Sequence, residues 1–69
     1  MKLVFVRYSV HEYMNKTVNG YITREIHLSD IIDIEKDKID DLEYIKDRLS
    51  KMYGFITEQI EIKYVRTWQ

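Results

Sequence analysis

The sequence predicts an α+β domain of ββαβ order, in which a three-stranded antiparallel sheet with strand order 2-1-3 carries one amphipathic helix on one face. Residues 2–14, 20–28 and 57–68 alternate between apolar and polar side chains, as strands with one buried face do. Residues 36–54 instead place apolar side chains three and four positions apart, which is the period of an amphipathic helix. These two periods together predict the fold class.

The first two strands are predicted to form a hairpin with one buried face. The even positions hold most of the apolar side chains, so we expect this side to face the core: Val4, Val6, Tyr8 and Val10 in the first strand, and Ile22, Ile26 and Leu28 in the second. Residues 15–20 between the strands are turn formers. A longer or bulged loop is favoured there, because a two-residue turn at Asn15-Lys16 would bring even positions opposite odd ones.

The register of this hairpin is predicted from its side-chain pattern. Directly opposed residues of an antiparallel pair point to the same face, so even positions must pair with even positions. Opposite charges and hydroxyl pairs across the strands then favour one register. The expected pairs are Val10 with Ile22, Val6 with Ile26 and Val4 with Leu28 on the core side, and Arg7 with Glu25, Ser9 with Thr23, His11 with Tyr21 and Phe5 with His27 on the other side.

Residues 29–35 have no clean period, and two interpretations are open: a helical turn capped by Ser29, or an extended connection. The helix predicted for residues 36–54 begins at an N-cap, Asp37, and ends at Gly54. Its apolar stripe consists of Ile39, Leu42, Ile45, Leu49 and Met52, and we expect Leu42 and Leu49 to pack on Val6, Val10 and Ile62.

Residues 57–68 are predicted to form the third strand, with Ile60, Ile62, Tyr64 and Trp68 on the core side. After the helix this strand must run parallel to the second one. We expect it beside the first strand, because every neighbouring pair is then antiparallel and the crossover keeps the usual right hand.

Composition bounds the class of protein. At 69 residues, 45% hydrophobic and 33% charged, the chain is expected to be one globular domain over residues 1–69. It has no cysteine, no long apolar run and no leader-like start, so we expect a cytoplasmic protein without membrane association. Charge is uneven, because residues 30–47 hold eight acidic residues against three lysines.

The sequence contains no pattern that is typical of an enzyme. In the expected register His11 and His27 lie well apart on the exposed side, with no carboxylate arrangement that predicts a metal site. No serine has a neighbouring base, and neither glycine lies in a phosphate-binding loop. We therefore expect a non-enzymatic protein without cofactor or metal.

Two surfaces are candidate binding sites. A single helix leaves the odd side of the sheet bare, which predicts an interface patch at Phe5, Arg7, Tyr13, Tyr21 and Lys63, with Leu3, His11, Thr23 and Val65 nearby. Scattered surface apolar residues are the plain alternative. On the helix, an acidic ridge is predicted with an exposed tyrosine at its centre: Asp37, Asp40, Glu43, Tyr44 and Asp47. An ordinary solvated face is the plain alternative there.

In its size, its alanine-free composition and its acidic segment 30–47, the chain resembles the small phage-encoded inhibitors of bacterial defence systems, anti-CRISPR proteins among them. The resemblance is one of class and transfers no functional residue. It implies stoichiometric inhibition of a protein partner, such as a nucleic-acid-binding defence protein, in the host-cell cytoplasm. The alternatives are a homodimer that pairs through the sheet and a nucleic-acid-binding module that uses the same face, although the glycine-aromatic signatures of RNA-recognition sheets are missing.

Overall fold

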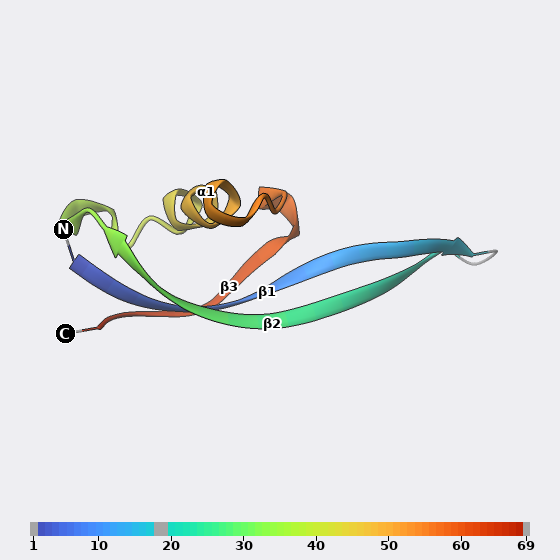
Figure 1. The fold of residues 1–69 in the computed structure, drawn as a ribbon, viewed down its shortest axis with the longest axis horizontal. Helices are drawn as coiled ribbons and strands as arrows, with labels where there is room; N and C mark the ends of the chain where they lie inside the picture. Colours follow the sequence, from blue (N-terminus) through green and yellow to red (C-terminus); the bar gives the residue numbers. More distant parts are fainter. Residues whose placement is uncertain (1, 18–19, 69) are drawn as a thin grey trace.

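The fold is that of a computed structural model, which describes residues 2–17 and 20–68. For residues 13–17 and 20–23 it describes the backbone but not the side chains. The elements follow in the order β1 (Lys2–Thr17), β2 (Gly20–Ile34), η1 (Lys36–Lys38), α1 (Leu42–Tyr53), η2 (Thr57–Gln59) and β3 (Ile60–Thr67). The three strands form an antiparallel sheet of order β2-β1-β3, and α1 lies over one of its faces (Figure 1). The predicted fold class and strand order are confirmed.

The hairpin is longer than predicted, and its register differs. Val10 pairs with Ile26 rather than Ile22, and Val4 pairs with Ile32 rather than Leu28. The prediction ended both strands too early, because residues 15–17 continue β1 and residues 29–34 continue β2 in the ladder. A bulge between Tyr13 and Asn15 restores the parity that a short connection would break. All pairs predicted for the hairpin are therefore wrong, although its even side does face the core.

Residues 29–34 continue β2, so the extended alternative for this segment is confirmed and the helical turn capped by Ser29 is wrong. Asp30 pairs with Val6, Ile32 with Val4 and Ile34 with Lys2. This segment gives the first half of β1 its backbone partner, which a helical turn there would have left without one. Ile32 and Ile34 are both buried, so the even side remains the core side to the end of β2.

The hairpin extends beyond the rest of the molecule as a two-stranded arm. Among the described residues, β3 pairs with β1 from Val4 to Val10, and the ladder of β1 and β2 beyond that point has no third strand there. In Figure 1 this part runs past both α1 and β3, and the molecule measures 47 × 17 × 16 Å. The core therefore lies at the end of the sheet that carries both termini.

A second bulge changes which side chains of β3 face the core. Ile60 and Ile62 pair with Val10 and Tyr8, but the register then shifts by one residue, and Val65 pairs with Val6. The shift brings Val65 onto the core side and turns Tyr64 and Trp68 to the opposite side, where each is 44% exposed. The prediction that Tyr64 and Trp68 face the core, and that Val65 is exposed, was wrong because one inserted residue inverts the alternation.

The helix begins later than predicted. α1 starts after Asp41, whose carboxylate accepts a hydrogen bond from the Tyr44 backbone N–H at 3.1 Å. Asp37 lies in the preceding short helix η1 and is not the N-cap. The predicted end is confirmed, because Gly54 adopts a left-handed conformation with φ of 79° and its N–H bonds to the Ser50 carbonyl at 2.7 Å.

The core is formed by one face of the sheet and the middle of α1. Ile45 and Leu49 are fully buried against the sheet, and Ile39 packs at the edge of the core. Leu42 and Met52, the outer members of the predicted stripe on α1, are 49% and 47% exposed, so their assignment to the core was wrong. The core residues are Val4, Val6, Tyr8, Val10, Ile32, Ile34, Ile45, Leu49 and Ile60.

Candidate binding surface

The odd positions of β1 and β2 form the face of the sheet that α1 does not cover, called the open face below. Phe5 and Arg7 lie on it as predicted, with Phe5 half-buried and Arg7 exposed. Beside them, the exposed apolar side chains of Leu3 and Ile31 extend the same side. The backbones of Tyr13 and Tyr21 belong to the arm, but the positions predicted for their side chains lie outside the described part.

An aromatic–arginine cluster occupies the open face near the chain termini; it consists of Phe5, Arg7, Tyr64, Arg66 and Trp68. The Phe5 ring stacks on Trp68 with centroids 6.0 Å apart, and meets Tyr64 edge-on at 6.3 Å. The Arg7 guanidinium lies 5.5 Å from the Tyr64 ring centre, and Arg66 lies 5.6 Å from Phe5 and 5.7 Å from Trp68. Rings and guanidinium groups thus alternate across two strands and support one another.

Backbone geometry holds this cluster in place. The bulge in β3 puts Tyr64 opposite Arg7 and Arg66 opposite Phe5. The Trp68 N–H donates to the Leu3 carbonyl at 2.8 Å, which continues the ladder by one residue and fixes the indole beside Phe5. Because these side chains extend from paired backbone, the backbone fixes their relative positions.

The sequence contains a signal for three of these residues that the period alone does not reveal. Val65 is the one aliphatic side chain between Lys63 and Trp68. Placing Val65 in the core puts Tyr64, Arg66 and Trp68 together on the opposite side, next to Phe5 and Arg7. The prediction instead continued the even alternation through this strand, and so placed Tyr64 and Trp68 on the core side.

Further along the open face, a chain of charged side chains surrounds Ser9. His27 and His11 both contact the Glu25 carboxylate, at 3.0 and 3.3 Å, so the expectation that the two histidines lie well apart was wrong. His11 also contacts Glu61 at 3.2 Å, and Lys63 contacts Glu61 at 3.1 Å. Hydrogen bonds from Lys63 and then His11 hold the pKa of Glu61 below its ordinary value.

In the part of the molecule that is described, these charged side chains neither contact the Ser9 hydroxyl nor form a group that could hold a metal ion. The Ser9 hydroxyl is fully buried and makes no hydrogen bond, so no base activates it as a nucleophile. Among the described residues, no group of three His, Asp or Glu side chains is placed to hold a metal ion.

The predicted acidic ridge does not form a single helix face. Asp37 lies in η1 and Asp40 in the turn before α1, whereas Glu43 and Asp47 lie on α1 and are paired with Lys46 and Lys51 at 3.5 and 3.0 Å. Tyr44 is half-buried against the core, and the Lys38 ammonium lies 5.7 Å from its ring centre. The prediction of an exposed Tyr44 was wrong, because the ring fills the edge of the core beside Ile45.

Comparison with known proteins leaves the surface to be interpreted from its own chemistry. No protein-family model, curated protein sequence or solved structure matches the chain. Within the described residues, no helix has the length and apolar character needed to cross a bilayer. The aromatic–arginine cluster is the feature of the open face that most resembles a recognition surface in its chemistry.

Proposed function

We propose that this protein is a small non-enzymatic binding module whose aromatic–arginine cluster docks on an acidic surface of another protein. In this proposal it acts in the cytoplasm as a stoichiometric inhibitor, of the kind encoded by phages or mobile elements, and blocks its partner by occupying a surface. The observation that carries the proposal is the assembly of Phe5, Arg7, Tyr64, Arg66 and Trp68 on a face without a covering element.

The composition of the cluster supports a protein partner. Tyrosine, tryptophan and arginine are the residues most enriched at the energetic centres of protein interfaces. Tyr64 and Trp68 remain nearly half exposed, and the apolar side chains of Leu3 and Ile31 lie close enough to form a rim. Such a patch gains free energy when a partner removes it from water.

The charges of the cluster favour an acidic partner. Arg7 and Arg66 contact rings, and neither makes an ion pair with any carboxylate among the described residues. Their guanidinium groups therefore keep donors that match carboxylates in a two-pronged geometry. An acidic surface would satisfy these donors while apolar groups of the partner cover the rings.

A nucleic-acid partner is less well supported. Single-stranded nucleic acids also stack on aromatic rings, but they require a positively charged track for their phosphates. On the described open face, Arg7, Lys63 and Arg66 are balanced by Glu25, Asp33 and Glu61, which gives no net positive charge. In a symmetric dimer that pairs through the open face, the cluster would meet the same charge-balanced face of a second copy, which offers it no net negative charge.

The test is capture of the partner by the protein and by paired variants, using lysate of the organism that encodes it. Trp68→Ala combined with Arg66→Ala should lower affinity for the purified partner by about 30-fold or more, because the loss of an interface anchor costs about 2 kcal/mol. The matched control is Asp40→Lys combined with Asp47→Lys, which changes two exposed acidic residues in and before α1, on the other side of the sheet. It should leave affinity within about threefold.

Three outcomes would contradict the proposal. Unchanged affinity in the Trp68→Ala, Arg66→Ala variant together with weak binding of the Asp40→Lys, Asp47→Lys variant would move the working surface to the acidic ridge. A dimer in sedimentation at micromolar concentration that Phe5→Ser converts to a monomer would indicate self-association instead. A gel shift with single-stranded nucleic acid that weakens steeply with salt would indicate a nucleic-acid binder.

A further inference from the structure

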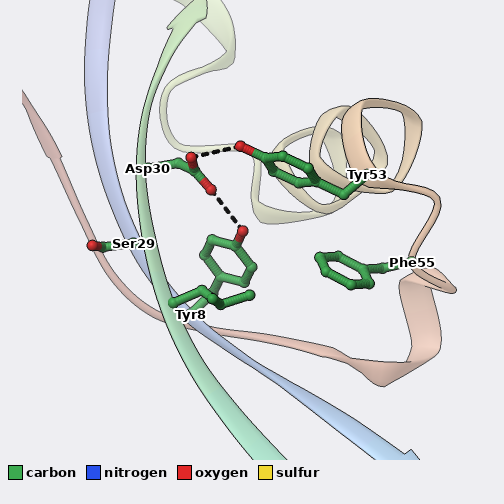
Figure 2. A pocket seen from close by; sticks show the side chains of 6 residues that line it. Tyr8, Ser29, Asp30, Tyr53 and Phe55 are labelled. Carbon is green, nitrogen blue, oxygen red and sulfur yellow. Dashed lines mark hydrogen bonds between the residues drawn. The ribbon is translucent and has the colours of Figure 1, made fainter.

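A pocket lies on the opposite side of the sheet from the aromatic–arginine cluster, between β2 and the C-terminal end of α1. Its volume is about 260 Å³, and its lining residues are Tyr8, Leu28, Ser29, Asp30, Tyr53 and Phe55. Figure 2 shows the rings of Tyr8, Tyr53 and Phe55 around the hollow, with the Asp30 carboxylate at its β2 side and the Ser29 side chain pointing away.

Local backbone geometry brings these groups together from three elements. Tyr8 and Asp30 extend from the helix-covered face of β1 and β2, and Tyr53 is the last residue of α1. The left-handed Gly54 ends the helix, and Phe55 then turns back, with its carbonyl accepting a hydrogen bond from the Ser50 hydroxyl at 2.5 Å. The Tyr53 and Phe55 ring centres are 5.8 Å apart and tilted by 44°.

The Asp30 carboxylate is held in this pocket by two phenols and by no cation. Tyr8 donates to one carboxylate oxygen at 2.7 Å, and Tyr53 donates to the other at 2.6 Å. No lysine, arginine or histidine among the described residues forms an ion pair with Asp30. Burial and the bond to Asp30 raise the pKa of Tyr8, and the bond to Asp30 raises that of Tyr53, so both phenols stay protonated as donors. The negative charge of the pocket is thus held in position and has no counter-charge from the described side chains.

Aromatic rings around a carboxylate form an environment that attracts cations. The face of each ring carries negative electrostatic potential, and cages of rings recognise quaternary ammonium groups in this way. We propose that the pocket binds a methylated alkylammonium group, with the positive charge near Asp30 and the methyl groups against Tyr8, Tyr53 and Phe55.

The polar atoms of the pocket select this class of cation. A guanidinium group binds a carboxylate best as a planar fork on both oxygens, and each Asp30 oxygen already uses one of its acceptor sites for a phenol hydrogen bond, which makes this fork less favourable. A primary ammonium has three donors to satisfy, and the pocket is lined mainly by apolar surface. A quaternary ammonium has no donors, so it requires only charge and ring contact. The volume, below the range of about 300–1,000 Å³ for drug-sized ligands, suits such a small group.

The first test is titration of the protein with tetramethylammonium and with choline, followed by the chemical shifts of the Tyr8, Tyr53 and Phe55 ring protons. The comparison ligand is the neutral isostere of choline, in which a tert-butyl group replaces trimethylammonium. We expect saturable binding of both cations and about tenfold weaker binding of the isostere, which has the same shape without the charge. Equal affinity for choline and the isostere, or no saturation by either cation at millimolar concentration, would overturn the proposal.

Variants separate the charge of the pocket from its rings. Asp30→Asn should weaken choline binding about tenfold, whereas Asp33→Asn, a matched change on the open face of the same strand, should not alter it. Tyr53→Phe keeps the ring and should retain most of the affinity, whereas Tyr53→Leu removes the ring and should not. Circular dichroism checks the fold of each variant, and Phe55→Leu gives a second ring deletion should Tyr53→Leu unfold. Equal losses in Asp30→Asn and Asp33→Asn would contradict the assignment.

Two comparisons of ligands identify the source of the cation. A peptide that contains trimethyllysine is compared with the same peptide containing unmodified lysine, and both are compared with free choline. Tighter binding of the trimethyllysine peptide than of choline would assign the pocket to a methylated protein side chain, and the reverse order would assign it to a small metabolite. Trp68→Ala should change the affinity for neither the trimethyllysine peptide nor choline, because the aromatic–arginine cluster lies on the other face of the sheet.

Discussion

Tyr8 links the centre of the sheet to the pocket beside α1. Its side chain is 1% exposed, and its hydroxyl donates to Asp30 at 2.7 Å. Burial, then the hydrogen bond and negative charge of Asp30, raise the pKa of this phenol above its ordinary value of 10.0. The unfolded chain loses the Tyr8 proton near pH 10.0, whereas the folded protein retains it to higher pH. The stabilisation is therefore complete below that pH and is lost as the pH rises through the folded pKa.

Tyr8→Phe should remove this pH dependence. The variant loses one hydrogen bond, so its free energy of unfolding at neutral pH should fall by about 1 kcal/mol or more, given that Asp30 also loses a donor. Between about pH 10 and pH 12 its stability should decline less steeply than that of the parent, since the titration of Tyr8 no longer contributes. Urea unfolding at a series of pH values measures both. Parallel curves for the two proteins would show that Tyr8 ionises in the folded state as it does in the unfolded one.

At the scale of the helix, the start of α1 depends on Asp41. Its carboxylate caps the Tyr44 N–H, so Asp41→Ala should cost about 0.5–2 kcal/mol of stability. Asp37→Ala is the matched control: it removes the same charge from η1, where no cap bond is made, and should change stability by less than about 0.5 kcal/mol. Thermal melts of both variants measure the two losses of stability. A larger loss of stability in Asp37→Ala than in Asp41→Ala would show that the helix begins at Asp37, as the sequence predicted.

The element types were predictable from the sequence because they depend on local periods. The alternation of residues 2–10 and the spacing of Ile45 and Leu49 give a strand and a helix wherever they lie in space. The end of the helix was predictable for the same reason, since Gly54 acts through its own backbone. Register was not predictable. It depends on bulges near Tyr13 and in β3, and each bulge depends on how distant strands pair.

The candidate binding surface was likewise predictable only where it depends on local alternation. Phe5 and Arg7 were placed on the open face, because β1 keeps its alternation over that stretch. The assignment of Tyr64 and Trp68 failed at the β3 bulge, where one residue inverts the face. The Asp30 pocket was missed because it requires contacts between residues more than twenty positions apart, and these follow only from the observed register.

For the whole molecule, the separation of a packed body from a two-stranded arm is the main feature of shape (Figure 1). The described core lies where β1 has partners on both sides and α1 covers one face. A two-stranded ribbon on its own is marginally stable in water. The arm is therefore held in shape by the body to which it is joined, and the described core does not include it.

Shortening the arm should leave the body folded. Replacing residues 13–23 with Asn-Gly joins Glu12 to Arg24, which already pair in the ladder and whose side chains form a salt bridge at 2.6 Å. The free energy of unfolding should change by about 1 kcal/mol or less, because no described core residue is removed. Ile60→Ala serves as the comparison: it deletes a buried side chain at the start of β3 and should cost about 2–5 kcal/mol. Urea unfolding followed by circular dichroism ranks the two variants. If the shortened protein unfolds as readily as Ile60→Ala, the arm stabilises the core and the division into body and arm does not hold.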